Sequence, residues 1–472
     1  MTIKTALTYD DVLLVPKKSS IQSRREVDTT SKLSRNINLK MPLVSANMDT
    51  VTESQMSIAM SLAGGIGIIH RFCDIDSQAK EVAKVKRKQN IIIDNPFIVN
   101  PQNTLAEVKE KIREFNCKSF LVTDNSQVLL GILTHRDTIF AKDDQIMVRE
   151  LMTPKSQLIT APYNIGPEKA RELMNNNKVE KLPLVDEEFR IKGLITATDI
   201  VKNYNNVNAS KDSKGRLLVG AAIGVRDDFM ARAEALIRAE ADVLVLDIAH
   251  GHSDNELNAI AKIKSRYPDV ELIGGNIATA KAASDLIKTG VDAVKVGIGP
   301  GSICTTRITT GFGIPQLTAI FNVSRVCQKH QIPMNADGGV KQPGDLVKAL
   351  AAGADTVMMG GQFSGTKETP GPIITYRGRQ YKISRGMASL TAALSRPDAK
   401  EKLAEITPEG VEARVPYRGP VQNIINQYIG GLRSGMSYGN ARNLAELRKN
   451  AEFIRITNSG IRESNSHDNE VL

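Results

Sequence analysis

The sequence contains no tryptophan, and aromatic residues make up only 4% of its 472 residues. A surface that stacks nucleic-acid bases needs aromatic side chains, so this composition disfavours that class of binding protein. No apolar run approaches the roughly 20 residues that span a bilayer. Residues 1–10 lack the apolar core of a secretory signal. We therefore expect a cytoplasmic protein with no membrane partner and no nucleic-acid partner.

Cysteine is also scarce. The four cysteines show no CxxC pairing and no metal-like spacing with histidine: Cys73, Cys117, Cys304 and Cys327. This pattern disfavours a disulfide scaffold or a zinc site, and it suits a reducing compartment in which a thiol stays free. The net charge of +10 comes from dispersed lysine and arginine residues, which fit an enzyme whose substrate and cofactor carry phosphates.

One loop concentrates chemically active groups. It reads Gly297-Ile298-Gly299-Pro300-Gly301-Ser302-Ile303-Cys304-Thr305-Thr306-Arg307. Glycine and proline let the backbone turn tightly, and main-chain amides in such a turn can cradle an anion. The thiol of Cys304 becomes a nucleophile once it is deprotonated. A glycine-rich turn around a small buried cysteine is the alternative interpretation.

Short apolar runs alternate with helical stretches through most of the chain. The runs lie at 243–247, 271–276, 293–297, 333–337 and 356–360, and helical stretches lie between them, such as 227–239 and 280–289. Apolar strands separated by helices predict a parallel sheet. With further strands near 43–45 and 67–69, the series favours an α/β fold of the (β/α)₈ TIM-barrel type. In this fold, the carboxyl ends of the strands line the active site.

A repeat interrupts this alternation. The segment 131–137, Gly-Ile-Leu-Thr-His-Arg-Asp, recurs at 193–199 as Gly-Leu-Ile-Thr-Ala-Thr-Asp. Each copy follows a strand-like run, at 120–124 or 182–186, and a helical stretch, at 105–115 or 167–177. The pattern predicts an inserted α/β module at 93–205 that divides the barrel into 1–92 and 206–472. A module with a purely structural role is the alternative.

The glycine-rich loop and its continuation at 310–316 (Thr-Gly-Phe-Gly-Ile-Pro-Gln) resemble the catalytic loop of the IMP dehydrogenase / GMP reductase family. The resemblance covers essentially the whole chain, and the repeat resembles a tandem CBS (Bateman) module. It implies a purine nucleotide oxidoreductase in which Cys304 attacks C2 of the purine. It also implies that Glu409 pairs with Thr306 to move protons.

The resemblance implies further site residues. For the purine nucleoside monophosphate substrate they are Met48, Ser302, Asp337, Gly338, Gly339, Gly360, Gly361, Gly386 and Met387. In this set Asp337 binds the ribose hydroxyls, backbone amides hold the phosphate, and Gly386 and Met387 lie against the purine. The implied cofactor contacts are Asp247, Asn276 and Thr279. A regulatory adenine or guanine nucleotide would bind the CBS module at Thr134, Asp137, Thr196 and Asp199.

A potassium ion and a defined assembly are also implied. The carbonyl oxygens of Gly299, Gly301 and Cys304 would bind K⁺, because hard cations prefer oxygen ligands. The residues that would complete this site from a neighbouring subunit are Glu463, Ser464 and Ser466. The family resemblance implies a homotetramer that can pair into an octamer through the CBS modules.

The segment between Met387 and Glu409 bears on the direction of the reaction. Dehydrogenases of this family carry an Arg-Tyr pair there as the base that activates water, whereas here Arg396 precedes proline. Loss of a general base slows such a step by about 10²–10⁴-fold. Ser384 also replaces the tyrosine that is usual in the dehydrogenases. These features predict GMP reductase, which converts GMP to IMP and ammonia with NADPH.

Two alternatives remain. The segment His250-Gly251-His252-Ser253 and the CBS module are more typical of IMP dehydrogenase, which oxidises IMP to XMP with NAD. A catalytically inactive CBS nucleotide sensor is the third possibility, and an intact Cys304, Thr306 and Glu409 argue against it.

Overall fold

The chain divides into two compact units. A computed structural model describes residues 3–88, 91–115, 117, 119–139, 141, 143–204, 207–226, 228–394 and 407–465. The first unit comprises Met1–Lys86, Asn208–Ser210 and Leu217–Leu472, and the second comprises Arg87–Val207 and Lys211–Arg216. Within the described ranges, every helix is too short or too polar to cross a membrane.

The first unit is built on a closed barrel of eight strands. The strands follow the order β14-β15-β16-β17-β18-β19-β4-β5, and each pairs with its neighbours in parallel. Their bounds are β4 (Leu43–Ser45), β5 (Ile66–Ile69), β14 (Gly220–Ile223), β15 (Val243–Leu246), β16 (Glu271–Ile277), β17 (Ala293–Val296), β18 (Met334–Asp337) and β19 (Thr356–Met359). The predicted TIM barrel is confirmed.

The barrel strands are apolar on both faces. In β15 all four side chains are buried. Val243 and Val245 join the cluster inside the barrel, whereas Leu244 and Leu246 join the cluster that packs against the helices. A strand whose side chains alternate between two buried faces needs an unbroken apolar run, which explains why the sequence pattern was informative.

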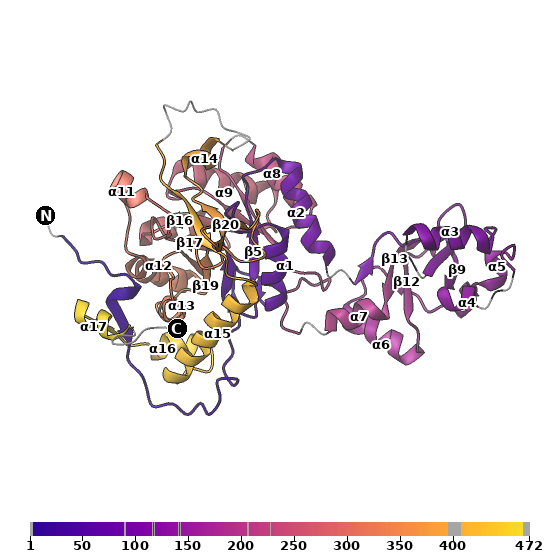
Figure 1. Cartoon of the computed structure of the whole chain (residues 1–472), viewed down its shortest axis with the longest axis horizontal. Helices are drawn as coiled ribbons and strands as arrows, with labels where there is room; N and C mark the ends of the chain where they lie inside the picture. Colours follow the sequence, from indigo (N-terminus) through magenta and orange to yellow (C-terminus); the bar gives the residue numbers. More distant parts are fainter. Residues whose placement is uncertain are drawn as a thin grey trace. The chain divides into compact units, whose positions relative to one another are not determined.

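Helices surround the barrel strands (Figure 1). The main ones are α1 (Ser54–Ala63), α2 (Ile75–Lys88), α8 (Phe229–Arg238), α9 (Asp254–Arg266), α10 (Ala280–Thr289), α12 (Gln316–His330), α13 (Pro343–Ala351), α15 (Val421–Tyr438) and α16 (Leu444–Asn450). In α10 the apolar face buries Ala282, Ala283, Leu286 and Ile287. These helices cover the outer face of the barrel and leave the carboxyl ends of the strands to the loops.

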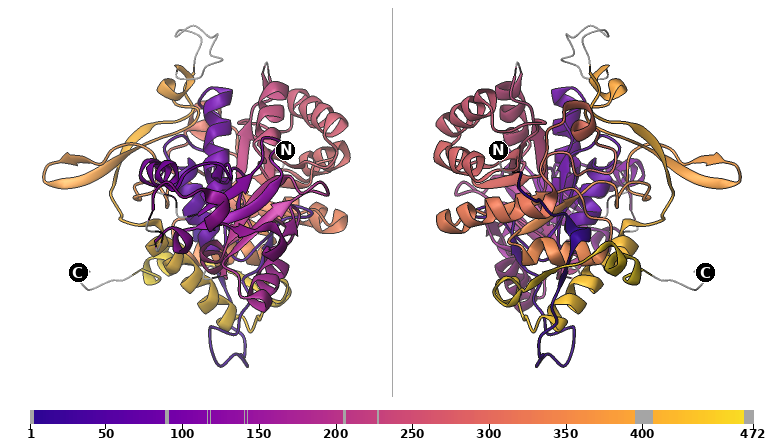
Figure 2. Two further views of the ribbon diagram at one scale, coloured as in Figure 1. Left: turned by 90° about the vertical axis from the view of Figure 1, so that its right-hand side faces the viewer. Right: turned by 90° about the vertical axis from the view of Figure 1, so that its left-hand side faces the viewer.

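Smaller elements complete this unit. They are η1 (Tyr9–Asp11), β1 (Val12–Leu14), β2 (Ser31–Lys32), β3 (Asn38–Leu39), α11 (Thr306–Thr310), β20 (Ile374–Tyr376), β21 (Arg379–Arg385), α14 (Leu390–Leu394), β22 (Glu412–Pro416), β23 (Phe453–Arg455) and α17 (Asn458–Glu463). Strands β20, β21 and β22 form an antiparallel sheet, and its β20–β21 hairpin extends away from the barrel (Figure 2). Strand β1 pairs with β23, so a segment near the start of the chain lies beside one near its end.

The second unit contains two sheets built alike. The first sheet has the order β10-β9-β8-β7 and the second β11-β12-β13-β6. The first half contains β7 (Ile98–Val99), α3 (Leu105–Phe115), β8 (Ser119–Thr123), β9 (Leu129–Thr134), α4 (His135–Ile139), α5 (Val148–Leu151) and β10 (Thr153–Pro154). The second contains η2 (Lys155–Gln157), β11 (Ala161–Pro162), α6 (Pro167–Asn177), β12 (Lys181–Val185), β13 (Ile191–Thr196) and α7 (Ala197–Tyr204), together with β6 (Ile92–Ile93). Both halves run β-α-β-β-α along the chain, as the repeat predicts.

The predicted elements agree well with the observed ones. All seven proposed barrel strands are present, and the helices expected at 105–115, 167–177 and 280–289 have those bounds. Strand β14 was not predicted, because Gly220, Ala221 and Ala222 are small residues that do not read as an apolar strand. Helix α8 begins at Phe229, and Asp227, the first residue of the stretch expected there, is outside the described residues.

Candidate active site

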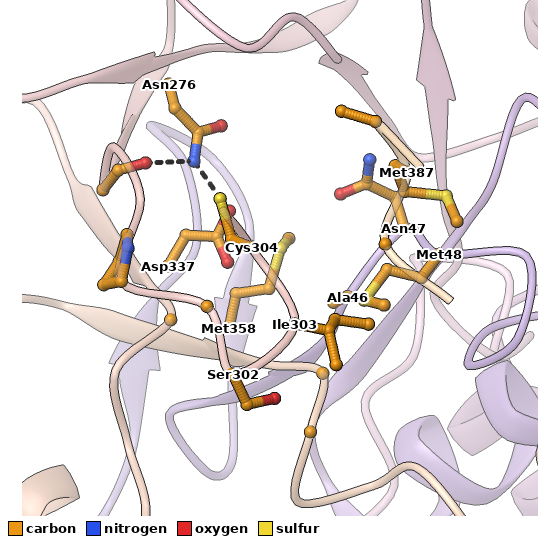
Figure 3. A pocket seen from close by; sticks show the side chains of 18 of the residues that line it. Ala46, Asn47, Met48, Asn276, Ser302, Ile303, Cys304, Asp337, Met358 and Met387 are labelled. Atoms are coloured by element: carbon orange, nitrogen blue, oxygen red, sulfur yellow. Dashed lines mark hydrogen bonds between the residues drawn. The ribbon is translucent and has the colours of Figure 1, made fainter. Parts of the chain in front are cut away.

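A cavity of about 730 Å³ opens at the carboxyl ends of the barrel strands. This volume suits a small-molecule site. Its lining includes these predicted site residues: Met48, Asp247, Asn276, Gly299, Gly301, Ser302, Cys304, Thr306, Asp337, Gly338, Gly339, Gly360, Gly361, Gly386, Met387 and Glu409. In Figure 3, Met387, Asn47 and Met48 lie on one side of the view, and Asn276 and Asp337 lie on the other.

Cys304, Thr306 and Glu409 form a chain of hydrogen bonds. The thiol of Cys304 lies 3.2 Å from Thr306 Oγ1, as donor to that oxygen. The hydroxyl of Thr306 in turn donates to Glu409 Oε2 at 2.7 Å. Cys304 is partly exposed to the cavity, so a nucleophile and a carboxylate are joined through one hydroxyl beside an open space.

Main-chain bonds bring Glu409 to the catalytic loop, although the two segments are far apart in sequence. The amide of Thr305 donates to the carbonyl of Glu409 at 2.9 Å, and the amide of Val411 donates to that of Ile303 at 3.0 Å. Cys304 and Gly410 form an isolated antiparallel bridge. The position of Glu409 is therefore fixed by backbone pairing as well as by its side chain.

Arg307 holds the catalytic loop together. Its Nε donates to the carbonyl of Ile298 at 3.1 Å, and its Nη2 donates to the carbonyl of Ile314 at 2.6 Å. The guanidinium thus joins the two ends of the loop that contains Cys304. This contact explains a cation at this position without a direct role in the chemistry.

Glycines allow close contacts between other residues that line the cavity. A Cβ atom on Gly360 would lie 2.8 Å from Met48 Sδ, and one on Gly361 would lie 2.6 Å from Ser302 Oγ. Any larger residue would displace these two side chains. The structure therefore brings together four residues that the sequence assigned to one substrate site.

Asp337 belongs to a polar cluster at the end of β18. Its Oδ2 accepts bonds from Asn276 Nδ2 at 2.9 Å and from Lys295 Nζ at 3.1 Å. Lys295 also contacts Asn276 Oδ1, and Asn276 Nδ2 donates to the carbonyl of Gly297 at 2.7 Å. In the described part of the chain both side-chain contacts of Asp337 use Oδ2, so Oδ1 is the oxygen left for a ligand.

Comparison with known proteins agrees with this geometry. The IMP dehydrogenase / GMP reductase domain matches residues 6–467. The chain belongs to this family. It is 49% identical to inosine-5′-monophosphate dehydrogenase of Nitrosopumilus maritimus, over 99% of each chain. It is 46% identical to GMP reductase of Leishmania donovani, over 99% of this chain and 98% of that one.

A solved structure is similar over the same length. It is the crystal structure of a cysteine-to-alanine variant of Trypanosoma brucei GMP reductase with guanosine 5′-monophosphate. It is 44% identical, covers 99% of each chain and superimposes with a TM-score of 0.87. Members of the IMP dehydrogenase / GMP reductase family are purine nucleotide oxidoreductases that use a nicotinamide cofactor, and this protein is one of them.

The cavity of this family member is also lined by charged residues that follow β5 and β15. Arg71 and Asp247 face each other there, with Arg71 Nε 3.1 Å from Asp247 Oδ2 and Arg71 Nη2 3.3 Å from the Asp247 carbonyl. Phe72 and the segment 224–226 line the same region. A cation, a carboxylate and an aromatic ring fit the phosphate, amide and ring groups of a nicotinamide nucleotide.

Ser384 stands where the family dehydrogenases usually have tyrosine, and it pairs with Ser364. Ser384 is buried, and its hydroxyl lies 3.2 Å from that of Ser364. Nearby, Arg418 Nη1 donates to the carbonyl of Gln362 at 3.0 Å and contacts its side-chain oxygen at 3.2 Å. Ser364, Ser384 and Arg418 all line the cavity, so this end carries hydroxyls and a cation.

Thr279, one of the predicted cofactor contacts, lies outside the cavity. Thr279 is exposed and is not among the residues that line the cavity. Its hydroxyl accepts the amide of Ala282 at 3.2 Å and caps the start of α10. The structure therefore accounts for Thr279 locally, without a ligand.

The predicted CBS ligand residues bond to each other. The amide and hydroxyl of Thr134 donate to Asp137 Oδ2 at 2.7 and 2.8 Å, and the hydroxyl of Thr196 donates to Asp199 Oδ2 at 2.6 Å. These pairs stand at the starts of α4 and α7. A cavity of about 790 Å³ in this unit is lined instead by Asp94, Thr160, Ala161, Pro162, Tyr163, Asn164, Val185, Asp186, Glu187, Phe189 and Lys192.

Several residues predicted for the potassium site make other contacts in the structure, and one lies outside the described residues. The carbonyl of Gly301 accepts the amide of Cys304 at 3.2 Å, which uses one of its lone pairs. Glu463 ends helix α17, and Ser464 caps it by bonding back to the carbonyl of Gly460. Ser466 lies outside the described residues. The same holds for Arg396, the arginine before proline in the segment between Met387 and Glu409.

Sequence reasoning missed several ionisable residues that lie at the site or behind its wall. Arg71, Lys295 and Arg418 line the cavity, and Glu256 lies fully buried on α9. Each of these side chains bonds to a residue in another segment of the chain, so the residues next to it in the sequence do not indicate the contact. The one available signal was Lys295, a lysine inside an otherwise apolar strand.

Glu256 should make stability depend on pH. Burial raises its pKa from 4.5 to about 8, so between these values the folded state holds a proton that the unfolded state has released. The free energy of unfolding should therefore fall as pH rises through this window. Glu256→Gln removes the ionisable group and should raise stability by on the order of 3 kcal/mol near pH 7.

Denaturant unfolding across this pH window tests the expectation. Glu271→Gln is the matched control, because Glu271 is also buried on β16 but bonds to Asn36 at 2.6 Å. This variant retains Glu256, so the part of the pH slope that comes from Glu256 should remain. An unchanged slope in Glu256→Gln would show that Glu256 is ionised throughout.

Proposed function

We propose that this protein is a GMP reductase, which converts GMP to IMP and ammonia with NADPH as the reductant. The observation that carries the proposal is the Cys304–Thr306–Glu409 chain combined with the sequence between Met387 and Glu409, which contains no Arg-Tyr pair. The residues needed to form and break a bond to Cys304 are in place. The base that family dehydrogenases use to activate water is not in that segment.

The proton path follows the hydrogen bonds. The Cys304 thiol passes its proton through Thr306 to Glu409 as the sulfur attacks C2 of GMP. The new bond joins Sγ to C2, and the amino group on C2 leaves as ammonia with the proton that Glu409 returns. NADPH, when bound, supplies the hydride that replaces the amino group. Cleavage of the C2–Sγ bond then frees IMP and leaves Cys304 as a thiolate, which takes up one proton from solvent to restore the thiol.

Binding residues are assigned from the lining of the cavity. Asp337 would accept the ribose hydroxyls through Oδ1, while Lys295 and Asn276 hold its other oxygen. The amides of Ser302, Gly339, Gly360 and Gly361 would hold the phosphate. Met48 and the Gly386–Met387 step would pack against the purine. The face with Arg71, Asp247 and Asn276 would hold the cofactor.

Asp247→Asn should weaken cofactor binding selectively. The carboxylate orients Arg71, and a hydrogen bond to a charged group is worth enough that its loss should raise KM for NADPH at least about tenfold. KM for GMP should change little. Steady-state kinetics with each substrate varied in turn measures both. Asp254→Asn, on the exposed start of α9, is the matched control, and an equal rise in both KM values would contradict the assignment.

Two parallel assays test the function itself. Purified protein is followed by the absorbance of the reduced nicotinamide, NADPH in a mixture with GMP and NADH in a separate mixture of IMP, NAD⁺ and potassium. A fall in the first with no rise in the second supports the reductase. A sustained rise in the second would mean IMP dehydrogenase and another residue that activates water. The dehydrogenase is the second candidate because the Nitrosopumilus maritimus relative is 49% identical.

The proposal extends to the second unit and to assembly. Its two β-α-β-β-α halves and its cavity suit a tandem CBS module that binds a regulatory purine nucleotide, with Tyr163 or Phe189 against the base. A K⁺ ion would bind the carbonyls of Gly299, Gly301 and Cys304 in a homotetramer, which can pair into an octamer. Equilibrium ultracentrifugation with and without nucleotide tests the assembly.

A further inference from the structure

Glu256 occupies a space that glycines keep open. It is fully buried on α9, which packs against β16. A Cβ atom on Gly251 would lie 2.5 Å from Glu256 Oε2, and one on Gly274 would lie 3.1 Å from Oε1. Side chains at these two positions would collide with the carboxyl group. The chain therefore accommodates a carboxyl group at this point behind the active-site wall.

Of the two carboxyl oxygens of Glu256, one has a hydrogen-bond partner among the described residues. Oε1 accepts the amide of Gly275 at 2.6 Å. Oε2 is buried and has no hydrogen-bond partner among the described residues. Burying a carboxylate with one hydrogen bond is unfavourable, so the neutral acid is preferred. Burial accordingly raises the pKa of Glu256 to about 8, and nearby Lys295 only partly offsets the effect.

The Gly275 peptide links Glu256 to the site. Lys295 packs on the same residue, because a Cβ atom on Gly275 would lie 2.8 Å from Lys295 Cβ. The next residue is Asn276, which together with Lys295 holds Asp337 Oδ2. Glu256 and Lys295 thus hold one short segment of backbone whose following side chain positions Asp337.

Few charges face Glu256. Lys295 on β17 and Asp247 after β15 are the groups that act on it electrostatically. On α10, Asp285 is bonded to His252 and Lys281. On α8, Arg232 pairs with Asp228 and Arg238 pairs with Glu234. Lys295 is therefore the cation that a charge on Glu256 would attract.

We propose that Glu256 is a positioning residue whose protonation state controls how firmly Lys295 and Asn276 hold Asp337 by their hydrogen bonds. The neutral carboxyl leaves Lys295 on Asp337 Oδ2. Ionised Glu256 competes for Lys295, which loosens Asp337 and weakens binding of the nucleotide ribose. The inference rests on the proposed role of Asp337 in substrate binding, but it holds for either direction of the reaction.

The test is binding of GMP and of IMP to the full-length protein, measured by calorimetry between about pH 7 and pH 9. Wild-type affinity should fall about five- to tenfold more than that of Glu256→Gln across this range. Near pH 7 the two proteins should bind alike. Because binding is measured without turnover, the result does not depend on whether the enzyme reduces GMP or oxidises IMP.

Glu271→Gln serves as the matched control and should follow the wild type at every pH. Parallel pH profiles for wild type and Glu256→Gln would overturn the proposal and leave Glu256 a purely structural residue. If Glu256→Gln does not fold, infrared spectroscopy of the wild type still decides. A protonated-carboxyl band should disappear as affinity falls, and an affinity loss with no change in that band would also overturn the proposal.

Discussion

Replacing Cys304 with alanine is expected to lower turnover by at least about 10⁴-fold, the scale on which loss of a covalent nucleophile acts. Without Sγ no bond to C2 can form, and the Thr306–Glu409 pair has no thiol to deprotonate. Binding of GMP should persist, because the phosphate and ribose contacts lie elsewhere in the cavity. Single-turnover assays and calorimetry on the same preparation measure the two effects.

Cys73→Ala is the matched control for this prediction. Cys73 is also partly exposed, but it does not line the cavity. It should keep wild-type turnover. Turnover that survives Cys304→Ala would exclude covalent catalysis through this residue. A chain that binds nucleotide but is inactive even with Cys304 intact would support the sensor alternative.

Replacing Glu409 with glutamine is expected to lower kcat by about 10²–10⁴-fold, the range for loss of general acid–base catalysis. Glutamine can still accept the hydroxyl of Thr306, so geometry is retained while proton transfer is lost. Thr306→Val should cause a loss of similar size, because it interrupts the same path. Steady-state and single-turnover rates of both variants measure this.

The double variant distinguishes a proton path from two separate roles. If Thr306 and Glu409 act as a unit, the combined loss should be close to that of either single variant. Fully additive losses would contradict the relay. Glu412→Gln, three residues beyond Glu409 and exposed on β22, should leave the rate unchanged.

The barrel could be predicted because its strands are buried on both faces. An apolar run such as Val243–Leu246 is most readily accommodated in a strand that is buried on both faces, and the helices between the strands fix the parallel order. Strand β14 shows the limit of this argument. Gly220, Ala221 and Ala222 pack as tightly as larger residues, but nothing local distinguishes them from a loop.

The site could be predicted in part. Cys304 and Thr306 are two residues apart in the sequence, and the glycine pairs stand at strand ends, so local pattern and fold point the same way. The contacts of Arg71 with Asp247 and of Lys295 with Asp337 join different strands, and their geometry exists only in the closed barrel. Thr279 shows the reverse case, since a helix cap and a ligand contact use the same residue type.

The segment between Ala388 and Glu409 is tied at its base. The amide of Glu409 donates to the carbonyl of Ala388 at 2.9 Å, so the chain leaves and returns at one point. Doubling the length of a closed loop costs only about 0.6 kcal/mol. Relatives of this protein can therefore gain or lose residues here at little cost in stability while Glu409 keeps its place. Exchanging this one segment between a reductase and a dehydrogenase is thus a practical route to redesigning what happens to the purine after it is bound to Cys304.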